Sequence, residues 1–73
     1  MRVGDLCRLG NYHHQLRFVQ VGKDQIGNIV LITSTSAKEN GVVFPHYCVG
    51  INLTTGKQWT YPKSNLEVIS ESR

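Results

Sequence analysis

Short runs of apolar and β-branched residues alternate with turn-forming residues along this chain. In its last third, two runs rich in β-branched and aromatic residues, 47–53 and 58–61, flank a Thr/Gly turn at 54–57. This arrangement is typical of a β-hairpin. Pro62 stops the second run, and a Ser/Asn turn leads into a final apolar strand at 66–69.

The earlier part of the chain predicts four further extended segments, the last of which opens at 42–44 after a polar tip at 36–41 and is interrupted by Pro45. The run at 3–9 is entered through a tight Gly-Asp turn, and the run at 16–21 is expected to be the returning arm of a long first loop. The longest apolar run, 26–35, contains four consecutive large aliphatic residues and predicts a central strand with both faces covered for part of its length. Gly27 suits a β-bulge or a close backbone approach, and Asn40-Gly41 predicts a turn.

No window shows an apolar period of 3.6 residues, so the sequence predicts an all-β fold in a single domain over residues 1–73. Closing five short strands into a small barrel would remove the exposed sheet edges. The uniform apolar run at 29–32 does not show which of its residues point inward. We expect the core to come largely from Val3, Leu6, Leu9, Phe18, Ile29, Leu31, Val49, Ile51, Trp59, Leu66 and Val68.

Charge and composition narrow the function only slightly. The formal net charge is +3, with eight Lys and Arg residues that form no run. This is a weak indication of an anionic partner. The N-terminus has no apolar signal region and no stretch approaches the roughly 20 residues needed to cross a bilayer, so we expect a cytoplasmic protein. Cys7 and Cys48 lie in apolar strand patterns and are expected to be reduced core residues.

Catalytic and metal-binding patterns are weak. The five acidic residues form no evident pair for acid–base chemistry. His13 and His14 are adjacent, so their side chains diverge in an extended loop. Together with His46 and Cys48 they would make a metal site only if the first loop folds over the strand predicted at 47–53. We expect exposed histidines and a core cysteine instead, with no metal and no cofactor.

The segments 4–9, 26–30 and 59–69 resemble the "GD-x-V-R … G-x-I-V … W-x-x-x-x-L-E-V-I" layout of small SH3-like proteins. Many of these are encoded by tailed bacteriophages, including the cyanophage relatives of T4. The resemblance covers nearly the whole chain and implies a five-stranded SH3-like barrel of viral origin. It implies no activity, because these motifs belong to the fold.

A second resemblance is to the plasmid-borne, trimethoprim-insensitive dihydrofolate reductases, which are SH3-like tetramers. The chain shares their Gly-Asp start, Tyr61-Pro62 and the closing segment 66–69. In that family a Val-Gln-Ile-Tyr segment lines a pore shared by four subunits, and a Lys near the start holds anionic ligands. Trp59 and Thr60 stand where the family has Gln and Ile, and Leu9 stands where it has Lys. A bulky indole would block such a pore.

The candidate binding surface is a set of aromatic and basic residues placed where SH3-like barrels carry their ligand groove. Such residues stack on bases, cradle a peptide or pack against a second copy of the chain. Trp59 has a competing interpretation as a core indole, and since Tyr61 is two residues on, both should be buried or both exposed. The candidates are Tyr12, His13, Tyr47, Lys57, Trp59, Tyr61 and Lys63.

Three functional hypotheses follow. The first is a non-enzymatic interaction module that binds a protein partner or itself. The second is a weak, electrostatic binder of nucleic acid, whose affinity would fall steeply with salt. The third is a reductase-like homotetramer, which a monomeric mass would exclude.

Overall fold

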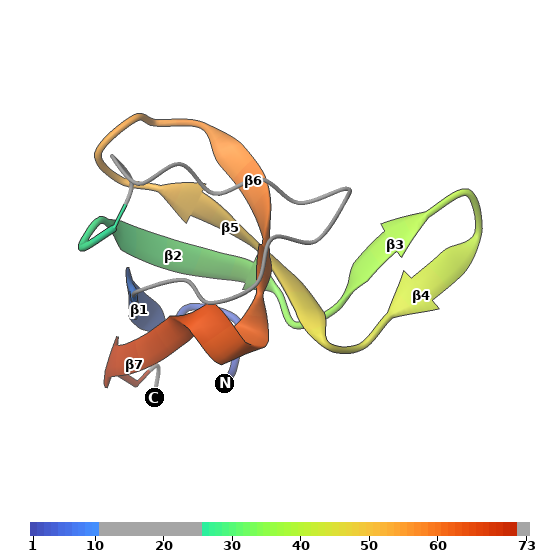
Figure 1. Ribbon diagram of the computed structural model, residues 1–73, viewed down its shortest axis with the longest axis horizontal. Coiled ribbons are helices and arrows are strands. Elements are labelled where there is room, and N and C mark those ends of the chain that lie inside the picture. The colour runs from blue at the N-terminus through green and yellow to red at the C-terminus, as the bar shows by residue number, and fades with distance from the viewer. Residues whose placement is uncertain (11–25, 72–73) are drawn as a thin grey trace.

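The computed structural model describes residues 1–10 and 26–71. This part of the chain is built from short strands joined by tight turns (Figure 1). No described helix is long and apolar enough to cross a membrane. The elements are β1 (Leu6–Leu9), β2 (Ile29–Ser34), β3 (Ala37–Glu39), β4 (Val42–Phe44), β5 (Tyr47–Asn52), β6 (Gln58–Pro62), the 3₁₀ turn η2 (Lys63–Asn65) and β7 (Leu66–Ser70).

Five of the strands form one antiparallel sheet in the order β6-β5-β2-β1-β7, and β3 and β4 form a separate two-stranded hairpin. The all-β prediction is therefore confirmed. In the described residues β6 and β7 are the edges of the sheet and are not paired with each other, so closure into a barrel is not confirmed. The extended segment predicted at 16–21 lies outside the described residues.

The predicted turns explain how the strands begin and end. The positive φ angles of Gly4, Asn40 and Gly56 lie in the turns that the sequence indicated. Pro62 ends β6, and η2 then leads into β7. Gly27 differs from expectation. Its φ of 89° places it in a turn, and its backbone N–H donates to the carbonyl of Leu9. A Cβ at Gly27 would meet no atom within 4 Å. It therefore marks neither a bulge nor a close approach.

The core lies on one face of the five-stranded sheet. Tyr61 on one edge strand and Leu66 and Val68 on the other contact the same cluster, so the sheet curls around a single core. The fully buried hydrophobic members of this cluster are Cys7, Leu9, Val30, Ile32, Cys48 and Tyr61.

The predicted core was wrong for much of the sheet. Leu6, Leu31 and Ile51 are cross-strand partners in one row, and this row is only half-buried because it lies on the opposite face of the sheet. Ile29 and Val49 are half-buried as well, whereas Val3 and Trp59 are exposed. Phe18 lies outside the described residues. Both faces of β2 are apolar, so the inward face is selected by the register, which pairs Val30 with Cys7 and Ile32 with Gly50.

Candidate functional site

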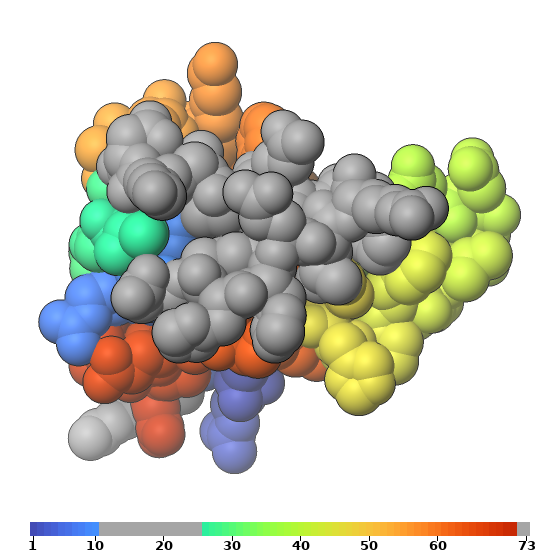
Figure 2. Space-filling view, in the orientation of Figure 1, coloured from blue at the N-terminus to red at the C-terminus, as the bar shows by residue number. Residues whose placement is uncertain are grey.

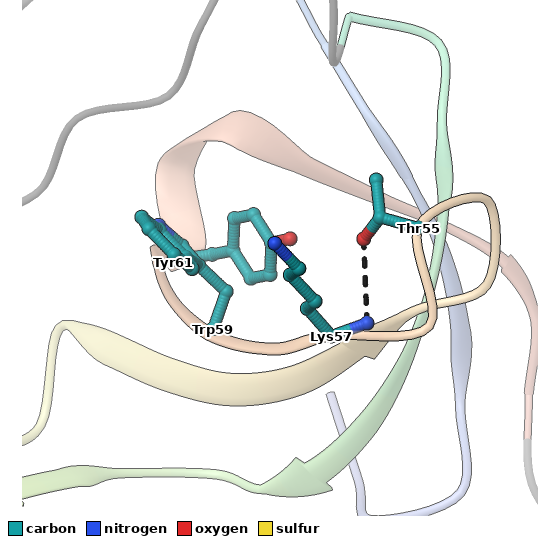
Figure 3. A pocket seen from close by; sticks show the side chains of 4 residues that line it. All are labelled: Thr55, Lys57, Trp59 and Tyr61. Atoms are coloured by element: carbon teal, nitrogen blue, oxygen red, sulfur yellow. Dashed lines mark hydrogen bonds between the residues drawn. The ribbon is translucent and has the colours of Figure 1, made fainter.

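A solvent-open hollow of about 220 Å³ lies along β6 and the turn that precedes it. Four of the described residues line it, and we call it the β6 hollow (Figure 3). They are Thr55, Lys57, Trp59 and Tyr61.

The alternation of an extended chain brings three of these side chains together. Lys57, Trp59 and Tyr61 are each two residues apart, so their side chains leave the backbone on the same side (Figure 3). Across the sheet, Trp59 is paired with Gly50, which has no side chain to place beside the indole. Trp59 remains 43% exposed. The hollow therefore presents a large aromatic surface to solvent next to a lysine.

Tyr61 forms the buried end of the hollow. Its ring belongs to the core cluster and its exposed fraction is 0%. The hydroxyl oxygen accepts a hydrogen bond of 3.4 Å from Nδ2 of Asn52, which is also buried. This bond leaves the phenol hydrogen itself free to donate. Tyr61 is thus held firmly between the core and the hollow.

The turn between β5 and β6 is organised by side chains that the sequence analysis did not single out. Oδ1 of Asn52 accepts hydrogen bonds from the backbone N–H groups of Thr54 and Thr55, at 2.9 and 3.2 Å. Oγ1 of Thr55 accepts one from the backbone N–H of Lys57 at 3.3 Å (Figure 3). An Asn placed two residues before a Thr/Thr/Gly turn is the signal for such contacts and would have identified them. They fix the backbone from which the Lys57 side chain projects.

The ionisation of the buried groups follows from their surroundings. Burial raises the pKa of the Tyr61 hydroxyl above its ordinary value of 10.0; the hydrogen bond from Asn52 opposes this shift and Cys48 adds to it. Burial likewise raises the pKa of the Cys48 thiol to about 11. Both groups are neutral at physiological pH. Among the described residues, the lining of the hollow offers an ammonium group, two hydroxyl groups and an indole, and no carboxylate to act as a base.

Three of the seven predicted site residues, Lys57, Trp59 and Tyr61, meet in the β6 hollow, whereas Tyr47 and Lys63 are described and do not line it. Tyr47 is half-buried, packs against the core and makes an edge-to-face contact with Phe44, with ring centroids 6.2 Å apart. Lys63 is half-buried in η2, and its backbone N–H donates to the carbonyl of His46 at 3.0 Å.

The two predicted residues of the first loop, Tyr12 and His13, lie outside the described part of the chain. The expectation that Trp59 and Tyr61 are both buried or both exposed was wrong, since they share a face but differ in exposure. Tyr61 faces Cys48 over the core, whereas Trp59 lies closer to the turn.

Other candidate sites are weaker. Within residues 1–10 and 26–71, no group of three or more His, Cys, Asp or Glu side chains is placed to hold a metal ion. A second hollow of about 210 Å³ is lined by Met1, Arg2, Asp5 and Glu71. The Asp5 carboxylate at that place already accepts a hydrogen bond of 2.8 Å from the backbone N–H of Arg2. It therefore serves to close the N-terminal turn.

Comparisons of this chain with protein-family models, with curated proteins and with solved structures gave no match. The residues and their geometry are thus the basis for assigning a function.

Proposed function

We propose that this chain is a non-enzymatic interaction module of the SH3-like type, encoded by a tailed phage or another mobile element. It acts in the cytoplasm and binds a protein partner through the β6 hollow. The observation that carries the proposal is the exposure of the indole of Trp59, 43%, beside Lys57 at a hollow with a rigid aromatic end. Exposed aromatic residues of this kind are enriched in protein interfaces.

The chemistry of the hollow describes the segment that it would bind. An apolar or aromatic side chain would pack against the indole, and an acidic group next to it would pair with Lys57. Because the turn is already fixed, little conformational entropy would be lost on binding.

The described cations support this proposal over nucleic-acid binding. Arg8 already forms a 2.7 Å ion pair with Glu67, whereas Lys38 and Lys57 lie in the β3–β4 hairpin and before β6. Among the described residues that line the hollow, Lys57 is the single cation, whereas a phosphate backbone is held by several Lys and Arg side chains. Leu9 is fully buried. The resemblance aligns it with the ligand-binding lysine of the reductases, so this position offers no side chain to an anionic ligand, which argues against the enzymatic hypothesis.

Affinity capture from a bacterial lysate tests the proposal with four forms of the protein. We expect one captured protein to be retained by the wild type and by Leu53→Ala, and lost with Trp59→Ala and Lys57→Glu. Leu53 is a matched control because it is 53% exposed and does not line the hollow. If every captured protein binds Trp59→Ala as well as the wild type, the hollow is not the binding site.

The single tryptophan provides a direct titration for the alternatives. Single-stranded DNA and RNA added at low salt should leave the fluorescence of Trp59 unchanged. Quenching that disappears steeply with added salt would instead favour nucleic-acid binding. Turnover of dihydrofolate with a nicotinamide cofactor by the purified protein would contradict the non-enzymatic assignment.

A further inference from the structure

The β3–β4 hairpin projects from the five-stranded sheet (Figure 1), and the space-filling view shows it extending beyond the body of the molecule (Figure 2). Among the described residues its two strands pair only with each other. A two-stranded ribbon is at best marginally stable in water. Val42 and Val43 are nonetheless 54% and 55% exposed. The hairpin thus places apolar side chains where a solvated arm would carry polar ones.

The geometry of the turn determines which backbone groups face outward. Asn40 and Gly41 have φ angles of 51° and 79°, the pattern of a type I′ two-residue turn. In such a hairpin the residues that flank the turn, here Glu39 and Val42, exchange the first pair of hydrogen bonds. The next pair, Lys38 and Val43, is then not hydrogen-bonded. The N–H and C=O groups of those two residues point away from the hairpin, one residue on each edge.

The two edges differ in how they would receive another strand. The edge of β3 carries Lys38, and a lysine on an edge strand discourages pairing with another chain. The edge of β4 carries two exposed valines and no charge over Val42–Phe44. Pro45 follows directly and limits the strand to this length. The β4 edge is therefore suited to adding one short strand.

We propose that two copies of this chain associate by antiparallel pairing of their β4 strands about a two-fold axis at Val43. The N–H of each Val43 donates to the carbonyl of the other, the two valine side chains meet on one face, and the two hairpins become a four-stranded sheet. This register is complementary to itself, as a two-fold interface requires.

The charge distribution leaves this part of the surface open to a second copy, the occupant that the self-complementary register fits. Each chain carries +3, so two copies repel each other in most orientations. The hairpin carries Lys38 and Glu39 and no net charge, and it projects away from the rest of the molecule. Pairing through β4 thus joins the neutral parts of the two chains. This interface uses a different surface from the β6 hollow.

Sedimentation velocity tests the proposal on the full chain from about 10 µM to about 1 mM, the range of weak contacts. The wild type is expected to pass from monomer to dimer as the concentration rises, because so small an interface binds weakly. Val43→Lys should weaken dimerisation at least tenfold. Val3→Lys is the matched control, since Val3 is 58% exposed and outside the hairpin, and it should dimerise like the wild type. Trp59→Ala should also dimerise normally, which separates this interface from the hollow.

Oxidative cross-linking tests the register. Hydrogen-bonded residues opposite each other have Cα atoms about 5.5 Å apart, a distance that a disulfide spans. Val43→Cys should thus form a covalent dimer faster than Val3→Cys, while the fully buried Cys7 and Cys48 do not compete. A wild type that stays monomeric, dimerisation of Val43→Lys equal to that of the wild type, or equal cross-linking of the two cysteine variants would each overturn the proposal. Circular dichroism verifies that every variant is folded.

Discussion

Gly50 in the middle of β5 has no room for a side chain, so Gly50→Ala is a sharp test of the packing. A Cβ at this position would overlap Cγ1 of Val30 and lie 3.0 Å from the carbonyl oxygen of Leu31. Val30 is fully buried and cannot turn into solvent, and the Leu31 carbonyl belongs to the strand paired with β5. Overpacking of this kind costs about 1–3 kcal/mol. We expect a loss of about 2–3 kcal/mol, because both contacting groups are held in place.

Urea unfolding followed by circular dichroism measures this loss. Small domains are stabilised by roughly 0.1 kcal/mol per residue, or on the order of 7 kcal/mol here. With a slope of about 1 kcal/mol/M, the midpoint for Gly50→Ala should fall by about 2 M or more. Gly10→Ala is the matched control, since its Cβ would lie 3.4 Å from the carbonyl oxygen of Asn65, an ordinary contact. That variant should unfold within about 1 kcal/mol of the wild type.

A double-mutant cycle tests the cause of the loss. Val30→Ala alone should destabilise the protein by about 2 kcal/mol by leaving a cavity. In the Gly50→Ala background it also removes the methyl group that clashes, so the combined loss should be smaller than the sum by about 1 kcal/mol or more. A midpoint for Gly50→Ala equal to that of Gly10→Ala, or strictly additive losses, would refute the packing around Gly50.

Three further predictions concern stability. The folded-state pKa of Cys48, about 11, lies above its ordinary value of 9.0. The buried neutral thiol therefore contributes on the order of 2–3 kcal/mol to the free energy of unfolding below pH 9.0, and this contribution is lost as the pH rises toward 11. A urea midpoint that stays constant over this interval would contradict the prediction. Asn52→Ala should lower the free energy of unfolding by about 1–3 kcal/mol, because the Tyr61 hydroxyl and the backbone of the turn lose their hydrogen-bond partner. Thermal unfolding measures this loss, and Tyr61→Phe, measured in parallel, removes the hydroxyl contact alone. Arg8→Ala should change the free energy of unfolding by less than about 1 kcal/mol, because both side chains of its ion pair are more than half exposed; a larger change in a urea titration would show that the pair does more than its exposure implies.

Three of the four described residues that line the hollow were predictable, because their grouping depends on local spacing. Lys57, Trp59 and Tyr61 alternate along one strand, so their shared side follows from the chain itself. Their exposure does not, because it depends on what lies across the sheet: Cys48 and the core for Tyr61, and Gly50 for Trp59. Asn52 and Thr55 were overlooked although both occur in a recognisable turn pattern. Tyr47 was a candidate by type, yet its ring packs against the core and Phe44.

The sequence by itself determined the turns and the described strands other than β3, because alternation, β-branching and Asn or Gly at positive φ act between close neighbours. Asn40-Gly41, the β5–β6 hairpin and the break at Pro62 are examples. β3 lies within the segment predicted as a polar tip. Only the tertiary structure decided which face of each strand is inside. The run Ile29–Ile32 is apolar on both faces, so its register against Cys7 and Gly50 had to make the choice, and a shift of one residue would have reversed it. The separation of β3 and β4 from the main sheet was decided in the same way, since strand pairing between distant segments is a property of the whole fold.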